Sequence, residues 1–242
     1  MRHIGGPRRW RTLSVLATLA ALAQCTAPPT TIEQIRARGE LRVATLNLPT
    51  TYYIGAQGPE GLEFELAQAF ARSLGVRLAM TPYETETQAI EALRTGGADL
   101  AAAQLSYRGP WHAFALPSRN YDEVEQLVVY VRGALKPRDI ASLRGRRIVV
   151  RAGSPQADVL AALRDRLDGG LQWRELPADA PNRPLDVLAA GEADVTIVDA
   201  PAFRFIHQAY PELLAAFELE HSRAVQWMLR RRSNALRAAV DA

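Results

Sequence analysis

One short pattern occurs twice in this chain and limits the folds that it can adopt. In each copy a stretch with helical spacing ends near a glycine, and Ala-Asp then leads into a short apolar run. The copies are Gly97-Ala98-Asp99-Leu100 and Glu192-Ala193-Asp194-Val195. A helix followed by a tight turn and a buried strand is part of a β-α-β unit, which builds a parallel sheet covered by helices. The repeat therefore predicts two α/β lobes of similar design.

The periodicity around both copies supports this prediction. Apolar residues recur near 3.6-residue spacing over 61–74, and Gly75 follows as a helix-ending residue. Ser154 and Pro155 together favour the start of a helix over 154–167. Further helices are expected over 32–38, 87–94, 139–143, 185–190, 202–210 and 234–240. Strands are expected over 41–45, 76–80, 99–105, 126–131, 147–151, 171–176, 194–198 and 224–229, with a long loop around Pro49, Gly55 and Gly58.

The first 24 residues are typical of an export signal. They contain four arginines and no acidic residue, and the run Leu13–Ala23 is uncharged. This run has the length of a signal-peptide hydrophobic region and is too short for a membrane span of about 20 residues. We therefore expect a signal peptide over 1–24 and a short Pro-rich tether over 25–31.

Two processing hypotheses compete at the end of the apolar run. Ala21-Leu22-Ala23 fits cleavage by an ordinary signal peptidase. Leu22-Ala23-Gln24-Cys25 is similar to a bacterial lipobox, in which Cys25 is lipidated and becomes the first residue, although Gln24 departs from that pattern. Cys25 is the one cysteine of the chain, so it has no internal disulfide partner. A lipid there would hold the protein on a membrane surface without spanning it.

The charge distribution argues against nucleic acid as a partner. The chain carries 29 Lys and Arg against 26 Asp and Glu, and four of the arginines lie in the first 24 residues. Without those four, 25 basic residues face 26 acidic ones, which gives a net charge of −1. The longest basic run, Arg230-Arg231-Arg232, is explained by a solvated end of a strand or helix. A nucleic-acid footprint needs a larger basic face than this.

Other site chemistry is not indicated. The four histidines, His3, His112, His207 and His221, lack the spacing of metal ligands, and no phosphate-binding loop or nucleophile elbow occurs. We therefore expect no metal and no cofactor. We also expect no catalysis by this chain, because glycoside cleavage needs a carboxylic acid positioned in a substrate groove.

The body of the chain resembles family 3 solute-binding domains. Within that group it is similar to the N-terminal domain of the lytic murein transglycosylase F family, over about residues 32–240. The resemblance is carried by the order and spacing of VATLNLPTTYY (43–53), GLEFELAQAFARSLGV (61–76), GGADLAAAQLS (96–106), YDEVEQLVVYVRG (121–133), SLRGRRIVVRAGSPQADVL (142–160), GEADVTIVDA (191–200) and AVQWMLRRRSNALRAAV (224–240).

The resemblance implies a type II, two-lobed periplasmic-binding-protein fold. In this fold each lobe is a mostly parallel sheet flanked by helices, and two hinge strands join the lobes. Applied to this chain, lobe one is expected over 32–129 plus 224–242 and lobe two over 130–223. A ligand would then sit between the lobes, which close on it about the hinge. The family's transglycosylase domain would follow this segment and has no counterpart in the sequence.

Four candidate binding residues come from the loops at the expected cleft. The resemblance implies a carboxylate-binding Arg after the strand 99–105, a position that Arg108 could take in a loop one residue shorter than the family pattern. It also makes Arg151 a basic cleft residue and Asp199 the acceptor for a ligand amine. Ser154 begins a helix whose N-terminus attracts carboxylates. The alternatives are surface charges for the arginines, a loop or cap role for Asp199 and a helix cap alone for Ser154.

Four more candidates lie in the first lobe. Tyr52 and Tyr53 could stack on a ligand, or they could pack on their own loop. Gln104 and Ser106 stand at the end of the strand 99–105, where each could hydrogen-bond to a ligand.

Three functions fit these features. The first is a monomeric, periplasmic sensor without catalytic activity that binds an amino acid or a murein peptide. The second is the substrate-binding lipoprotein of an amino-acid ABC importer, whose partner would be a permease. The third is a truncated lytic transglycosylase, with its catalytic partner encoded separately or lost.

Lipidation of Cys25 can be tested directly. We expect the mature chain to begin at Cys25 and to carry lipid, because the cysteine lies two residues after the end of the apolar run at Ala23. Intact-mass spectrometry of the protein purified from membranes checks this. An unmodified chain that begins at Gln24 would support ordinary cleavage instead.

Overall fold

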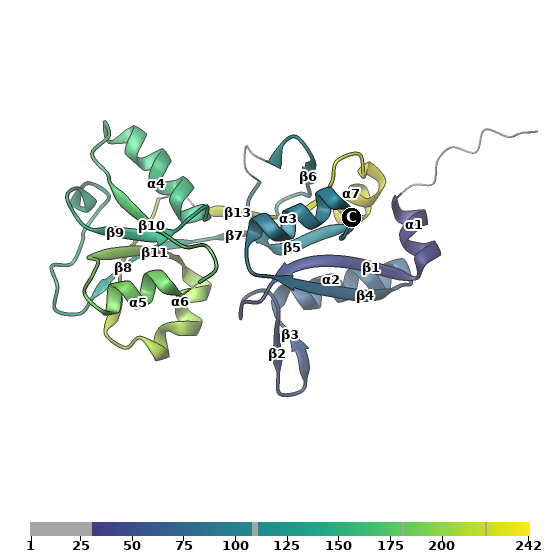
Figure 1. The fold of residues 1–242 in the computed structure, drawn as a ribbon, viewed down its shortest axis with the longest axis horizontal. Coiled ribbons are helices and arrows are strands. Elements are labelled where there is room, and N and C mark those ends of the chain that lie inside the picture. Colours follow the sequence, from purple (N-terminus) through teal and green to yellow (C-terminus); the bar gives the residue numbers. More distant parts are fainter. Residues whose placement is uncertain (1–30, 108–110, 181, 221) are drawn as a thin grey trace, which may run out of the picture.

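Two α/β lobes lie side by side in the computed structural model, which describes residues 31–107, 111–180, 182–220 and 222–242 (Figure 1). The two-lobed, type II architecture predicted from the sequence is confirmed. Each lobe has a sheet with a parallel core of three strands, extended by antiparallel strands, and helices cover both faces.

The sheet of the first lobe has the strand order β4-β1-β5-β13-β6. Strands β4, β1 and β5 are parallel, and β13 returns from the second lobe antiparallel to β5. Successive residues of β5 point to opposite faces, so Leu100 and Ala102 pack towards α2 while Ala101 and Ala103 pack towards α3. The elements are α1 (Thr31–Arg38), β1 (Glu40–Leu46), α2 (Leu62–Leu74), β4 (Arg77–Tyr83), α3 (Glu86–Thr95), β5 (Leu100–Leu105), β6 (Ala115–Pro117), β13 (Arg223–Arg230) and α7 (Asn234–Val240).

The second lobe repeats this plan with the strand order β10-β9-β11-β8-β12. Helix α4 covers one face through Leu160 and Leu163, and α5 and α6 cover the other through Leu188 and Phe203. The elements are β8 (Gln126–Val131), β9 (Ile148–Arg151), α4 (Pro155–Arg166), β10 (Trp173–Leu176), α5 (Arg183–Ala189), β11 (Val195–Asp199), α6 (Ala200–Ile206) and β12 (Leu213–Glu218).

The chain crosses between the lobes twice. Strand β7 (Asp122–Val124) leads into β8, and the start of β13 runs back beside β7 with Arg223 opposite Val124. All of β8 pairs with β11 and β12 of the second sheet. The first crossing therefore lies before Gln126, earlier than the boundary after residue 129 expected from the sequence.

The repeated Ala-Asp pattern has a structural cause. Asp99 stands just before β5 and Asp194 just before β11. These are the middle strands in the five-strand orders of the first and second lobes. The Asp99 carboxylate accepts from the backbone N–H of Arg42 (2.9 Å), and the Asp194 carboxylate accepts from that of Arg147 (2.7 Å). The Asp99 carboxylate is thus a strand clamp that links the start of β5 to β1, and the Asp194 carboxylate is one that links the start of β11 to the start of β9. The Arg147 side chain also bonds Asp194 and lowers the pKa of that carboxyl below its ordinary value.

Most expected elements are confirmed, and the differences are local. The loop around Gly55 and Gly58 contains a hairpin of β2 (Tyr53–Gly55) and β3 (Gly58–Glu60), which projects from the first lobe (Figure 1). The helix expected over 139–143 is a 3-10 turn over Ala141–Leu143, and the one over 202–210 is α6 followed by a 3-10 turn over His207–Ala209. Strands β6, β7 and β12 were not predicted. None of the helices in the described part of the chain is long and apolar enough to cross a bilayer.

The two strand clamps should differ in strength, because Asp99 is 1% exposed whereas the Asp194 side chain is 34% exposed. We expect Asp99→Ala to lower the free energy of unfolding by about 2–3 kcal/mol, since charged hydrogen bonds are lost in the interior. The matched change Asp194→Ala should cost about 1 kcal/mol or less, as for exposed ion pairs. Urea unfolding followed by circular dichroism measures both. Equal losses would show that burial does not set the strength of the clamp.

Candidate ligand-binding cleft and hinge

The two lobes enclose a hollow at the carboxyl ends of their parallel strands. Its volume is about 340 Å³. Residues that follow β1 and end β4, such as Leu48 and Tyr83, line it from the first lobe, and Arg151 at the end of β9 lines it from the second. A smaller hollow of about 120 Å³ adjoins it, where Leu48 and Arg151 meet Gln156 and Asp199. In open α/β sheets, ligands bind at the carboxyl ends of the strands.

Arg151 links the two walls of the cleft. Its Nη2 atom lies 3.8 Å from Oε1 of Glu86, the first residue of α3 in the opposite lobe. The Arg151 side chain is 16% exposed, and it borders both hollows. At 3.8 Å the pair is longer than a charge-assisted hydrogen bond of about 2.7–2.9 Å. The guanidinium therefore remains within reach of a ligand carboxylate.

Ser154 caps helix α4, as the sequence predicts. Its hydroxyl oxygen accepts from the backbone N–H of Ala157 at 3.3 Å, and Pro155 is the first helical residue. The residue is 1% exposed, so its side chain belongs to the helix cap. A direct contact between Ser154 and a ligand stays a prediction.

Asp199 lies at the end of β11, and three side chains already hold its carboxylate. Its Oδ2 accepts from Arg223 Nη2, while Oδ1 accepts from Gln156 Nε2 at 2.8 Å and from Gln126 Nε2 at 3.3 Å. Arg223 and Gln126 stand at the start of the returning strand β13 and at the start of β8. Asp199, the expected amine acceptor of the cleft, therefore also connects the end of β11 to the first residues of β8 and β13.

Arg223 brings three of the predicted site residues together. Its Nη1 atom donates to the backbone oxygen of Gln104 and, at 3.0 Å, to the hydroxyl of Ser106, while Nη2 bonds Asp199. The residue is 8% exposed. Sequence reasoning missed it because an Arg at the start of a strand is most simply a surface charge. Its place at a predicted lobe crossing was the one available signal.

Gln104 is held from both sides by charged residues. Its backbone N–H donates to the carboxylate of Glu63, its carbonyl accepts from Arg223, and its φ is +50°. Non-glycine residues are uncommon in this left-handed region, and they persist there where the surroundings fix the conformation. The two hydrogen bonds of Gln104 provide such a constraint.

Glu63 is a fully buried carboxyl of helix α2, whereas Glu65 on the same helix is exposed. Besides Gln104, the Tyr121 hydroxyl and Trp227 Nε1 (2.7 Å) donate to its oxygens. Burial raises the pKa of Glu63, and these three donors oppose that shift. Burial and the neighbouring Glu63 carboxyl raise the pKa of Tyr121 as well.

The two predicted tyrosines lie away from both hollows. The Tyr52 ring packs against Phe64 of α2 with 6.1 Å between ring centroids, and the Tyr53 hydroxyl donates to Glu60 at 2.7 Å within the hairpin. Their contact with a ligand stays a prediction. Arg108 and Cys25, the remaining candidates, lie outside the described residues.

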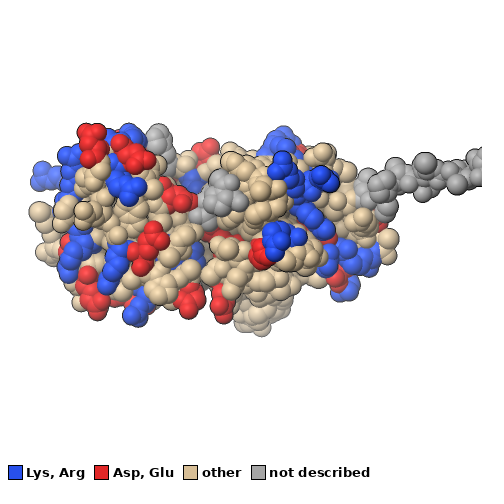
Figure 2. Space-filling model, turned by 45° about the horizontal axis from the view of Figure 1, so that its top comes forward, with Lys and Arg blue, Asp and Glu red and all other residues tan. Residues whose placement is uncertain are grey.

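Charged side chains lie on the outer surface of both lobes and also line the cleft. Figure 2 shows acidic and basic side chains interspersed over the second lobe on the face in view, whereas basic side chains predominate over the first lobe. In the part of the chain that the structure describes, no group of three or more His, Cys, Asp or Glu side chains is placed to hold a metal ion. The charged side chains that line the larger hollow are Glu84, Arg151 and Asp179.

Comparison with known proteins identifies relatives of this fold. The model of the bacterial extracellular solute-binding proteins, family 3, matches residues 41–242. Membrane-bound lytic murein transglycosylase F of Serratia proteamaculans is 34% identical over 201 residues, which is 83% of this chain and 41% of the relative. The protein of the same name from Sodalis glossinidius is 35% identical over 85% of this chain and 44% of its own length. The chain thus spans about two fifths of the length of these curated relatives.

Solved structures share the fold at lower identity. Holo ArgBP from T. maritima superimposes with a TM-score of 0.74 at 20% identity, covering 86% of this chain and 90% of that one. The ancestral amino acid-binding protein AncCDT-1 has the same TM-score at 19% identity, covering 88% and 91%. At these identities the likeness establishes the architecture.

Breaking the buried pair of Arg223 and Asp199 should destabilise the protein more than breaking an exposed pair. We expect Arg223→Ala to lower the free energy of unfolding by about 3–5 kcal/mol, because Asp199 loses its charge partner inside the protein. The control Arg166→Ala removes an exposed ion pair to Glu220 (3.4 Å) and should cost less than about 1 kcal/mol. Denaturant unfolding compares them. If the two variants lost the same small amount, the hinge pair would not have the importance given to it here.

Proposed function

Because the chain belongs to the bacterial extracellular solute-binding proteins of family 3, we propose that it binds a small solute between its lobes. The proposed ligand is an amino acid or a murein peptide, and the lobes close on it about the hinge. The observation that carries this proposal is the hollow of about 340 Å³, because its walls come from both lobes and include the Arg151 guanidinium. A cleft of this size suits a small ligand.

Arg151 is the proposed binding residue for a ligand carboxylate. A guanidinium can hold both oxygens of a carboxylate at once, which fixes the orientation of the ligand. The ligand would replace the long 3.8 Å pairing with Glu86 by shorter bonds. Since Glu86 belongs to the opposite lobe, this exchange would link binding to the arrangement of the lobes.

Asp199 is the proposed acceptor for a ligand amine. Because three side chains already bond its carboxylate, the amine would have to replace one of them. Of the three side chains that hold it, Gln156 also lines the smaller hollow, whereas Arg223 and Gln126 approach from the hinge. A ligand ammonium would therefore take the place of the Gln156 amide. The Arg223 pair would hold the carboxylate in position.

The relatives support a role in the cell envelope. The family is described as extracellular, and the curated relatives are membrane-bound by name. We infer that this chain works outside the cytoplasm, anchored through Cys25 if that residue is lipidated. Because those relatives are named as lytic murein transglycosylases, we favour a murein peptide over a free amino acid and a sensing role without catalysis. Binding of free arginine or glutamine alone would favour the importer hypothesis.

A thermal-shift titration tests ligand binding. At about 100 times its dissociation constant a ligand adds about 2.7 kcal/mol, which raises Tm by about 5–10 °C for a chain of this size. We expect such a rise with a murein tetrapeptide, and its loss in Arg151→Ala. The control is Arg174→Ala, an exposed residue of β10 that lines a hollow away from the cleft and should keep the rise. No shift with the tetrapeptide, arginine or glutamine would contradict the proposal.

A further inference from the structure

Three arginines converge on the Asp99 carboxylate, on the side of the first lobe opposite the cleft. The Nη2 atoms of Arg42 and Arg230 lie 3.2 Å and 3.6 Å from its Oδ1, and Nη2 of Arg38 bonds its Oδ2. Asp99 precedes β5, so this three-arginine cluster lies at the amino ends of the parallel strands, whereas the cleft lies at their carboxyl ends. We propose that the cluster of Arg38, Arg42 and Arg230 binds a phosphate group.

The second lobe shows how few arginines the strand clamp needs. In the described part of the chain Asp194 pairs with one arginine, Arg147, which donates through its backbone N–H and its Nη2, both at 2.7 Å. Arg42 makes the corresponding two bonds to Asp99 at 2.9 and 3.2 Å. The other two members of the cluster, at the ends of α1 and β13, are therefore additional to the clamp.

The additional arginines give the cluster a surplus of positive charge. Three guanidinium charges face one carboxylate charge. The acidic side chains of adjoining segments have arginines of their own, since Glu40 pairs with Arg77 and Glu91 with Arg94. The carboxyl end of α3, which borders the cluster, adds only about half a negative charge. An anion bound among the guanidiniums would relieve their mutual repulsion.

The cluster presents its arginines to solvent and hides its acid. The Asp99 side chain is 2% exposed, whereas Arg38, Arg42 and Arg230 have side chains that are 33%, 32% and 38% exposed. Their contacts with Asp99 use Nη2 atoms, and a guanidinium has five N–H donors. A phosphate group fits because its oxygens can accept from several directions and it carries up to two negative charges.

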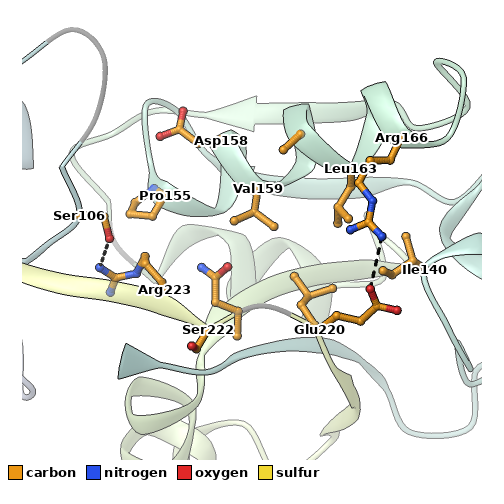
Figure 3. A pocket seen from close by; sticks show the side chains of 13 residues that line it. Ser106, Ile140, Pro155, Asp158, Val159, Leu163, Arg166, Glu220, Ser222 and Arg223 are labelled. Carbon is orange, nitrogen blue, oxygen red and sulfur yellow. Dashed lines mark hydrogen bonds and ion pairs between the residues drawn. The ribbon is translucent and has the colours of Figure 1, made fainter. Parts of the chain in front are cut away.

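Two arginines beside α4 show a different balance. Figure 3 shows Arg166 paired with Glu220 and Arg223 donating to Ser106, and Arg223 also pairs with Asp199. Each of these arginines thus has an acidic partner, in contrast to the three that share Asp99.

The position of the cluster favours a phospholipid headgroup as the source of the phosphate. Helix α1 lies at the end of the first lobe farthest from the second lobe (Figure 1). Its first residue, Thr31, follows Cys25 by six residues, which span about 20 Å at most. If Cys25 carries lipid, the cluster would stand close to the membrane, with the cleft at the opposite edge of the sheet.

Titration calorimetry of the full chain with inorganic phosphate, at constant ionic strength, tests the site. The double variant of Arg38→Gln and Arg230→Gln should bind at least about tenfold more weakly, because two charged donors are lost. The matched control of Arg166→Gln and Arg174→Gln removes the same charge from exposed positions of the second lobe and should bind as the original chain does. Arg151→Ala should also keep this binding, because the cluster does not depend on the cleft.

Vesicle sedimentation distinguishes the two sources of phosphate. Vesicles of equal parts phosphatidylcholine and phosphatidylglycerol are compared with vesicles of phosphatidylcholine alone. Binding to the anionic vesicles that the cluster variant loses and the control keeps assigns the site to a headgroup, and binding of inorganic phosphate alone assigns it to the free anion. Absence of both, or equal losses in the two double variants, would overturn the proposal.

Nuclear magnetic resonance locates the anion without any variant. The Nε–Hε signals of Arg38 and Arg230 should shift as inorganic phosphate or short-chain phosphatidylglycerol is added. If the cluster variant does not fold, these shifts decide the question, and shifts confined to other arginines would count against the cluster.

Discussion

The architecture of this molecule depends on one buried ion pair, between Arg223 at the start of β13 and Asp199 at the end of β11. The two side chains are 7% and 16% exposed, so both charges are largely removed from water. Desolvation offsets much of the attraction in such a pair, which makes its geometric role more important than its net contribution to stability. The pair fixes the returning hinge strand to the second lobe at the point where the cleft begins. The pairing of β13 with β5, β6 and β7 fixes the same strand to the first lobe.

Glu63 extends this constraint into the first lobe. The Gln104 peptide lies between two buried ionisable side chains, with its N–H donating to Glu63 and its C=O accepting from Arg223. These two hydrogen bonds hold Gln104 in the left-handed region of the backbone, where non-glycine residues need such a constraint. A continuous chain of polar contacts therefore runs from the core of the first lobe to the cleft edge of the second.

The sequence predicted those elements whose signals are local. Gly75 ends α2 in the left-handed conformation, and Ser154 caps α4, because these roles depend on a few neighbouring residues. Strand β12 was missed because its sequence, LLAAFE, suits a helix as well as a strand, and its pairing with the distant β8 decides the outcome. Arg223 was missed for the same reason. Its partners lie 24 and 119 residues away along the chain, so neither periodicity nor spacing could reveal them.

The same distinction explains why the candidate site was only partly predictable. The carboxyl ends of parallel strands can be located from apolar runs. These runs correctly placed four candidates at or beside such ends, namely Gln104, Ser106, Arg151 and Asp199. Their partners are set by the crossing segments, where short strands carry weak local signals. Asp199 is the clearest case, since its carboxylate belongs at once to the cleft hollow and to the hinge. A ligand cation that approaches this carboxylate meets an acceptor whose position the returning strand has already fixed. If the cleft binds a ligand amine as proposed, its occupancy and the geometry of the hinge would both involve the Asp199 carboxylate.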